Sequence, residues 1–305
     1  MQVLTSLEEP GRLGRPVHWA MGFFDGVHLG HAKVICSAST PGALRGVLTF
    51  CQHPLSLLCP ERQPLLLTPD MEQKKALLAA LGVDVMLCLP FTPGLAAMSP
   101  SAFLDALRAA CPLAGISVGV NWHFGRGGAG DTTFLRQYAA AHHFPALVQE
   151  LVEKGGQRVC SSLIRRCLTE GKLRLAEKFL GHPFRICGTV EHGQHLARRL
   201  GFPTANLTLP ERAALPPLGV YEVQATLGDK PWRGVANLGL RPTIREEKKI
   251  IRLESHFPGW QGDLYGRRLE VELCRFLRPE RRFDSLDALK EQMALDLAQV
   301  ASSGA

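Results

Sequence analysis

The first part of the chain alternates between two patterns, and this alternation restricts the possible folds more than any other feature. Short apolar runs, bounded by Gly, Pro or a charged residue as buried strands usually are, cover residues 16–21, 46–51, 83–89, 116–120 and 146–151. Helical periodicity covers residues 29–38, 70–81, 100–110, 131–141, 161–170 and 173–180. Strands that alternate with helices form right-handed βαβ units. The sequence therefore predicts a parallel sheet with helices on both faces.

The pattern changes after His182. Strand-like runs, separated by Gly- and Pro-rich connections, cover residues 185–191, 220–227, 232–238, 250–256 and 269–276. A closing helix over residues 285–300 carries one apolar face. We expect a mostly antiparallel small β-barrel or folded sheet, capped by this helix. Because 305 residues exceed what one core usually holds, we predict two domains, residues 1–182 and 183–305.

Net charge, cysteine spacing and the lengths of the apolar stretches exclude several classes of protein. The net charge of +7 is spread over both predicted domains, which suits an anionic ligand and does not indicate nucleic-acid binding. The nine cysteines are scattered and form no CxxC, which favours reduced and mostly buried thiols. The chain starts without the apolar core of a signal peptide, and its longest apolar stretch, residues 76–91, is interrupted by Gly82, Asp84 and Pro90. We therefore expect a cytoplasmic protein that binds no membrane.

The motif GFFDGVHLGH joins the first expected strand to the first expected helix. Backbone N–H groups and the positive end of the dipole make such a helix start suitable for a phosphate. Gly22, Gly26 and Gly30 allow the backbone to approach a ligand closely. His28 and His31 start the helix and could stabilise charge during phosphoryl or nucleotidyl transfer. A Gly-rich turn with two capping histidines is the structural alternative, and zinc is not favoured because no third ligand lies nearby.

Three later segments follow expected strands or start an expected helix: TFCQHP at residues 49–54, GVNWHFGR at 119–126 and VCSSLIR at 159–165. In open α/β sheets, ligands bind just beyond the carboxyl ends of the strands. Taken alone, each segment is also compatible with a structural role, and the two serines are compatible with a helix cap.

In this order and at these spacings, the four segments resemble the nucleotidyltransferase half of the bacterial bifunctional riboflavin kinase/FAD synthetase family. The family motifs are GxFDGVHxGH, TFxxHP, GxNFxFG and an ISSTxxR-like helix start. The resemblance implies a Rossmann-like domain in which His28, His31 and Arg165 stabilise the charge of the reaction. The implied ATP-binding residues are Gly22, Phe24, Gly26, His28, His31, Ser161, Ser162 and Arg165. The implied flavin-binding residues in this half are His53, Asn121 and Phe124.

The chain departs from the family pattern at four positions of these motifs. Phe23 stands where Asn is common, Gln52 replaces Pro, Cys160 replaces the first Ser, and Trp122 occupies a slot usually held by Phe. None of these changes removes a motif His, Asn or Arg, so we interpret them as drift. A chain that keeps its kinase but has weakened or lost adenylyltransferase activity remains the alternative.

The second half carries its own motifs: PTAN at residues 203–206, GVANLGLRPT at 234–243, LESH at 253–256 and DLYG at 263–266. The side-chain oxygens of Thr204 and Asn206 lie two residues apart in an expected loop, and such oxygens can hold Mg²⁺ that bridges to nucleotide phosphates. A simple turn at PTAN and a surface charge at Glu254 are the structural alternatives.

Together these motifs resemble the riboflavin kinase module of the same family. The resemblance implies a six-stranded β-barrel with a C-terminal helix. It further implies that Thr204 and Asn206 bind Mg²⁺ and ATP, that Glu254 is the base on the riboflavin 5′-hydroxyl, and that Arg241 contacts the flavin. Phosphoryl transfer needs little beyond positioning, metal charge and a group that accepts the hydroxyl proton.

The two resemblances imply one bifunctional enzyme. Its C-terminal domain phosphorylates riboflavin with ATP to FMN, and its N-terminal domain adenylylates FMN with a second ATP to FAD and pyrophosphate, with Mg²⁺ in both steps. The expected partners are small molecules only: riboflavin, FMN and ATP. A flavin- or RNA-binding regulatory protein without turnover is the alternative from another class, and it predicts salt-sensitive RNA binding without ATP consumption. The sequence leaves open the oligomeric state and the role of residues 245–249.

Overall fold

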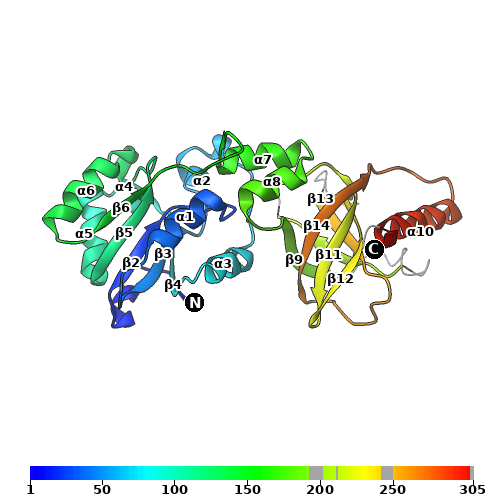
Figure 1. The fold of residues 1–305 in the computed structure, drawn as a ribbon, viewed down its shortest axis with the longest axis horizontal. Helices are drawn as coiled ribbons and strands as arrows, with labels where there is room; N and C mark the ends of the chain where they lie inside the picture. The colour runs from blue at the N-terminus through cyan, green and yellow to red at the C-terminus, as the bar shows by residue number, and fades with distance from the viewer. Residues whose placement is uncertain (192–201, 211, 242–249, 303–305) are drawn as a thin grey trace. The chain divides into compact units, whose positions relative to one another are not determined.

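The computed structural model describes residues 1–191, 202–210, 212–241 and 250–302 (Figure 1). By internal contacts the chain divides into two units, Met1–Leu163 and Ile164–Ala305, and each is described by itself. This division groups residues 164–182 with the second unit. The expected domain boundary after residue 182 stays a prediction.

All strands of the first unit's main sheet run parallel. In spatial order they are β1 (Gln2–Leu4), β4 (Val85–Leu89), β3 (Leu44–Phe50), β2 (Val17–Met21), β5 (Leu113–Gly119) and β6 (Ala146–Gln149). The five expected strands are all present, and the parallel α/β architecture is confirmed. The chain steps from β2 to β3 and β4 on one side and to β5 and β6 on the other, so the strand order reverses between β2 and β5. Ligands of such sheets bind at this point of reversal.

The four long helices expected between these strands are present, and side chains cap their N-termini. They are α1 (Leu29–Ser37), α3 (Met71–Ala80), α5 (Pro100–Ala110) and α6 (Thr132–Ala141), capped by His28, Asp70, Ser99 and Asp131. A cap side chain accepts a hydrogen bond from an unpaired N–H of the first turn, which fixes where the helix begins. Shorter elements complete the unit: β7 (Glu153–Lys154), β8 (Gln157–Arg158), α2 (Leu55–Leu58), α4 (Pro93–Ala97), η1 (Glu9–Leu13), η2 (Pro60–Arg62) and η3 (Arg126–Gly128).

The central strand β2 is buried on both faces. Trp19 belongs to a core that includes Leu104 of α5, whereas its neighbour Ala20 belongs to a separate core with Ile35 of α1 and Leu78 of α3. Successive side chains of a strand point to opposite faces, so helices cover both sides of the sheet. The long apolar runs of the sequence follow from this double burial.

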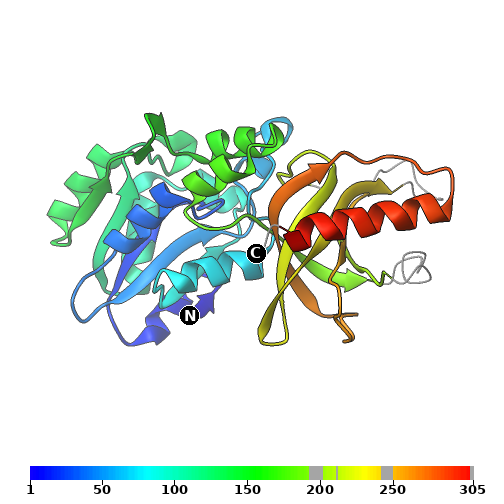
Figure 2. The same ribbon diagram turned by 45° about the vertical axis from the view of Figure 1, so that its right-hand side comes forward.

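The second unit begins with α7 (Ser161–Thr169), which spans the division, and α8 (Leu173–Leu180). Its strands form a closed, antiparallel, six-stranded barrel in the order β10 (Ala205–Thr208), β13 (Ile250–His256), β12 (Lys230–Arg241), β11 (Gly219–Leu227), β14 (Arg268–Arg278) and β9 (Arg185–Glu191). The final helix α10 (Leu286–Ser302) lies against the barrel (Figure 2). Its Val300 forms a buried cluster with Val220 and Val235 of the barrel. The expected barrel with a C-terminal helix is confirmed.

One element of the barrel was not expected. The PTAN segment was predicted as a loop, but Ala205, Asn206 and Leu207 belong to β10, so that prediction was wrong. β10 pairs with β13 on one side and with β9 on the other, which closes the barrel. These pairings are made to distant parts of the chain and therefore leave no local signal. Among the described helices, none combines the length and apolar character that a membrane span requires.

Candidate active sites

The loop between β2 and α1 adopts an unusual backbone conformation. Phe24, Gly26 and Val27 have φ of 54°, 85° and 40°. Positive φ is unfavourable for a β-branched residue such as Val27, and it persists only where the surroundings enforce it. The buried carboxylate of Asp25 enforces it here, because it accepts hydrogen bonds from the backbone N–H of Leu67 (2.9 Å) and of Thr68 (3.1 Å). In addition, Gly26 N–H donates a hydrogen bond to the Thr68 hydroxyl (2.8 Å).

The two histidines of this motif lie against each other at the start of α1. Their rings stack with centroids 3.5 Å apart. His28 is the N-cap, and its Nδ1 accepts a hydrogen bond from the backbone N–H of His31 (3.3 Å). In a neutral imidazole the ring hydrogen of His28 is then carried by Nε2. The structure thus brings together the two candidate groups at a helix N-terminus, where an anion is favoured.

A cavity of about 380 Å³ opens in front of these histidines. It lies at the carboxyl ends of β2 and β5, where the strand order reverses. Six predicted ATP-binding residues and one predicted flavin-binding residue line it: Gly22, Phe24, His28, His31, Ser161, Ser162 and Asn121. Ser161 also donates a hydrogen bond to the backbone oxygen of Asp25 (3.0 Å). This bond connects the start of α7 to residues 22–28, the loop between β2 and α1, which we call the histidine loop. The lining residues do not include Gly26, which lies within the loop, or Arg165, which lies further along α7.

A second cavity of about 210 Å³ adjoins the first. The two cavities share Met21, Gly22, Trp122 and His123 as lining residues. Most of the remaining lining is apolar: Leu48, Phe50, Pro54, Leu58, Phe91, Leu95, Ala96, Phe103 and Phe124. The rings of Trp122 and Phe124 are stacked, with centroids 4.3 Å apart. A flat aromatic ligand is suited to such a pocket, since aromatic rings stack favourably on one another.

His53, which was predicted to contact the flavin, lines neither of these two cavities. It packs edge-on against Phe23, with ring centroids 4.7 Å apart, and its Nδ1 accepts a hydrogen bond from Leu55 N–H (3.1 Å). Its observed contacts therefore support the histidine loop and the start of α2.

Sequence reasoning missed Lys74, a buried cation beneath the histidine loop. Its ammonium donates hydrogen bonds to the backbone oxygen of Phe23 and to the Thr49 hydroxyl (3.0 Å), and it lies 4.3 Å from the centroid of the Phe23 ring. Burial lowers the pKa of Lys74 to about 8. The sequence did contain a sign that Lys74 is buried: it lies one helical turn before Leu78, on the face of α3 that packs into the core.

In the second unit, three polar side chains form a row across neighbouring strands. Glu254 of β13 pairs in register with Asn206 of β10 on one side and with Asn237 of β12 on the other. Directly paired residues of a sheet project from the same face. The adjacent Leu253 is fully buried and pairs with Leu207 and Leu238, so the row lies on the face opposite the barrel interior.

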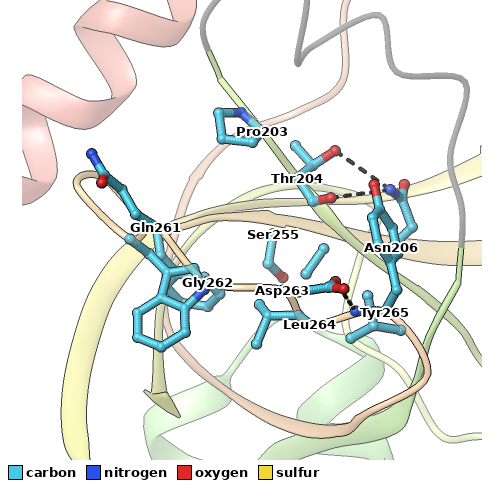
Figure 3. Close-up of a pocket in the computed structure, with 13 residues that line it drawn as sticks. Pro203, Thr204, Asn206, Ser255, Gln261, Gly262, Asp263, Leu264 and Tyr265 are labelled. Atoms are coloured by element: carbon cyan, nitrogen blue, oxygen red, sulfur yellow. Dashed lines mark hydrogen bonds between the residues drawn. The ribbon is translucent and has the colours of Figure 1, made fainter. Parts of the chain in front are cut away.

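Two cavities meet at the Asn206 end of this row. One encloses about 670 Å³ and is lined by PTAN residues and by residues 260–265, which include the DLYG motif (Figure 3). The other encloses about 390 Å³ and is lined by Glu254, Asn237 and side chains of α10 such as Met293. Thr204 and Asn206 line both. A group held in one cavity could therefore be transferred to a molecule in the other past these two side chains.

Hydrogen bonds fix the geometry of the PTAN segment. The side-chain amide of Asn206 donates to the backbone oxygen of Thr204 (3.3 Å) and to its hydroxyl (3.4 Å), as Figure 3 shows. His256, which lines the smaller cavity, bonds through Nδ1 to the backbone oxygen of Pro203 (2.8 Å). Burial lowers the pKa of His256, so the neutral ring is favoured. His256 is a second residue to which the sequence analysis gave no role.

The described residues contain no group of three or more His, Cys, Asp or Glu that could hold a metal ion by themselves. The Thr204 and Asn206 oxygens are neutral hard donors, which suit a Mg²⁺ that keeps water or phosphate as its other ligands. Arg241 ends β12, but its side chain and residues 242–249 lie outside the described part of the chain. The prediction for Arg241 and the role of the segment 245–249 are therefore not addressed by the structure.

Comparisons with known proteins agree with the two-part architecture. The family model described as FAD synthetase matches residues 13–163, and the model described as riboflavin kinase matches residues 180–303. The bifunctional riboflavin kinase/FMN adenylyltransferases of Escherichia coli K12 and Bacillus subtilis 168 are 39% and 32% identical to this chain. These matches cover 90% and 91% of this chain and 89% of each relative. A crystal structure described as a macrolide-efflux protein from Streptococcus pneumoniae superposes with a TM-score of 0.82 at 26% identity, covering 97% of both chains.

Proposed function

The chain belongs to the bifunctional riboflavin kinase/FMN adenylyltransferase family, and from this premise we propose how its cavities and side chains divide the two reactions. The enzyme phosphorylates riboflavin to FMN and adenylylates FMN to FAD, with ATP as the second substrate of each step. The matched family regions assign the first reaction to the C-terminal part of the chain and the second to the N-terminal part.

For the kinase reaction, we place ATP in the 670 Å³ cavity and riboflavin in the 390 Å³ cavity. The observation that carries this assignment is that Thr204 and Asn206 line both cavities, while Glu254 is the register partner of Asn206 and lines only the smaller one. Glu254 accepts the proton of the riboflavin 5′-hydroxyl while the oxygen of that hydroxyl forms a bond to the γ-phosphorus of ATP. At the same time the bond between the γ-phosphorus and the oxygen that leaves with ADP breaks. A general base is effective only within hydrogen-bond reach of the proton it removes.

We propose that the oxygens of Thr204 and Asn206 hold the Mg²⁺ of the Mg²⁺–ATP complex. The two side chains fit Mg²⁺, because two neutral oxygen ligands leave most of its coordination positions to phosphate and water. Bound Mg²⁺ would supply positive charge that stabilises the transferring phosphoryl group. The hydrogen bonds within PTAN and from His256 to Pro203 hold the two side chains in position for this role.

For the adenylyltransferase reaction, we place ATP in the 380 Å³ cavity and the isoalloxazine ring of FMN in the apolar 210 Å³ cavity. The shared lining residues let the FMN phosphate enter the ATP cavity, where one of its oxygens attacks the α-phosphorus and pyrophosphate leaves. His28, His31 and the N-terminus of α1 stabilise the charge of the transition state. Asn121 positions the phosphate, and Ser161, Ser162 and Arg165 bind the triphosphate.

We also propose that the enzyme works in the cytoplasm with small molecules as its partners. The nine free thiols support this assignment, since a reducing compartment keeps cysteines in that form.

The experiment that tests the whole assignment is a product assay. The chain is incubated with riboflavin, ATP and Mg²⁺, and the flavins are separated by chromatography over time. We expect FMN to rise first and FAD to follow, and we expect a chelator to stop both steps. Steady accumulation of FMN without FAD would show that the substitutions at Phe23, Gln52 and Cys160 have impaired adenylylation. FAD formation in excess chelator would contradict the Mg²⁺ assignment.

A further inference from the structure

Two thiols lie in contact at the carboxyl ends of β3 and β4. The Sγ atoms of Cys51 and Cys88 are 3.0 Å apart, and the Cys51 thiol also lies 3.1 Å from the Cys88 backbone oxygen. The backbone holds the two residues side by side, because Cys88 pairs in register with Thr49 and Cys51 N–H bonds to Leu89 O (3.0 Å). Cys88 is buried, whereas Cys51 is exposed. The pair therefore consists of one sulfur that solvent can reach and a second one directly behind it.

This thiol pair is connected to the adenylyltransferase site. Thr49, the register partner of Cys88, donates a hydrogen bond to the backbone oxygen of Phe23 (2.9 Å) in the histidine loop. Lys74 bonds the same hydroxyl and lies close enough to both sulfurs to interact with them electrostatically. On either side of Cys51, Phe50 and Pro54 line the apolar cavity assigned to the flavin. A covalent change at Cys51 would therefore act on groups that shape this site.

We propose that Cys51 and Cys88 are a redox-sensitive pair that closes to a disulfide in the presence of hydrogen peroxide, and that the disulfide lowers FMN adenylylation but not riboflavin phosphorylation. The proposal adds a modification site and a means of control to the adenylyltransferase half of the enzyme.

The chemistry proceeds in two balanced steps. The sulfur of exposed Cys51 attacks one oxygen of hydrogen peroxide, the O–O bond breaks, and the products are Cys51 sulfenic acid and one water. The sulfur of Cys88 then attacks the Cys51 sulfur, the S–O bond breaks, and hydroxide leaves with the Cys88 proton as a second water. Burial, and then the hydrogen bond with Cys51, raises the pKa of Cys88 to about 12, so Cys88 stays a thiol at neutral pH and is not the sulfur that attacks peroxide first. A thiol reductant reverses the reaction.

The disulfide would change the site by displacement. A disulfide bond would draw the two sulfurs about 1 Å closer than in the thiol form. Cys88 is fixed within the sheet, so most of the movement falls on Cys51 and the segment that follows it. That segment carries His53, whose ring packs on Phe23 of the histidine loop. A shift of this size at a catalytic site is enough to reduce a rate by roughly tenfold or more.

The test uses the full-length chain. The protein is treated with hydrogen peroxide, the excess peroxide is removed, and FMN adenylylation and riboflavin phosphorylation are measured before and after addition of dithiothreitol. Peptide mapping by mass spectrometry identifies any disulfide. We expect a Cys51–Cys88 disulfide, a loss of adenylylation of roughly tenfold or more that dithiothreitol reverses, and an unchanged rate of phosphorylation.

Variants separate the pair from the other cysteines, and each is compared with its own untreated rate. Cys51→Ser and Cys88→Ser should resist peroxide, whereas Cys36→Ser, which removes an exposed thiol of α1, should respond like the unmodified chain. Cys160 lines the ATP cavity and is the competing target. Resistance conferred by Cys160→Ser and not by Cys51→Ser would overturn the proposal. It would also be overturned if no Cys51–Cys88 disulfide formed, or if the disulfide formed without loss of adenylylation.

Discussion

His28 serves two purposes at one position: it caps α1, and it faces the cavity assigned to ATP. A substitution can therefore act on stability as well as on catalysis. The two effects are separable, because Asn is also a good N-cap but lacks an imidazole.

We predict that His28→Ala reduces FAD formation from FMN by roughly 10²–10³-fold, since it removes a group that stabilises transition-state charge. Riboflavin phosphorylation should stay within a few-fold of normal. His28→Asn should lose adenylylation to a similar degree while keeping the thermal stability that Ala loses. Both rates are measured separately, with FMN or riboflavin supplied. An equal loss of both activities would contradict the assignment of His28 to one reaction.

Glu254→Gln should produce the opposite pattern. The change keeps shape and hydrogen bonding but removes the base, so riboflavin phosphorylation should fall by roughly 10²–10⁴-fold, while adenylylation of supplied FMN survives. Glu270→Gln is the matched control, because Glu270 lies on β14 and lines neither barrel cavity. Normal kinase turnover in Glu254→Gln would show that Glu254 is a structural residue of its strand.

Lys74 predicts a pH dependence of stability. Its pKa is about 8 in the folded protein and about 10.5 in the unfolded chain, so between these values the unfolded state binds more protons. The free energy of unfolding should therefore rise with pH across this window, by up to ~3 kcal/mol from this group. Lys74→Met should lack the rise, and Lys75→Met, which changes a more exposed neighbour, should keep it. Urea unfolding of the three proteins at pH 7.5 and pH 10 measures the difference.

At the scale of elements, the helices and strands that are marked by neighbouring residues in the sequence were the ones that could be predicted. Helices α5 and α6 were placed nearly to the residue, because capping side chains and apolar periodicity mark them locally. Strands β1 and β10 were missed, because each is short and exists through pairing with a distant strand. The same reason explains why Lys74 and His256 received no role: their partners lie 51 and 53 residues away.

In both candidate sites, the residues that could be predicted from the sequence are those that belong to recognisable motifs. The sequence predicted roles for both histidines, the serines of α7 and the PTAN oxygens, and these groups line cavities in the structure, while their roles stay predictions. It did not reveal that Thr204 and Asn206 lie between two cavities, since that position depends on the barrel's register. Its assignment of His53 to the flavin stays a prediction; in the structure His53 packs on Phe23 and accepts a hydrogen bond from Leu55 N–H.

Close approach of β12 and β13 leads to a prediction at this scale. A Cβ atom added to Gly234 would lie 2.0 Å from the backbone oxygen of His256. Gly234→Ala should therefore separate the strands and lower stability by about 1–3 kcal/mol, with a loss of kinase activity because His256 holds the PTAN segment. Gly188→Ala, where the nearest atom would be 3.3 Å away, should cost less. Denaturant unfolding compares the two variants.

At the scale of the whole molecule, the two reactions should be separable. A fragment of residues 183–305 contains Thr204, Asn206 and Glu254, so it should convert riboflavin to FMN and form no FAD. A fragment of residues 164–305 should do the same with higher stability, because Phe179 and Leu180 of α8 are buried and Glu177 accepts a hydrogen bond from Phe184 N–H (3.2 Å). Flavin chromatography and thermal unfolding measure both. Any FAD from either fragment would refute the division of labour, and equal stability would favour a boundary after residue 182.

The row formed by Asn206, Glu254 and Asn237 has a consequence for how this enzyme can evolve. β13 pairs with β10 and with β12 without a break in register, and in such a strand a shift by one residue turns every later side chain to the other face. A single-codon deletion in the first half of β13 would direct Glu254 toward the barrel interior even though no residue of the site is lost. Lineages of this enzyme should therefore vary freely in the lengths of their loops, while the length of this strand stays constant.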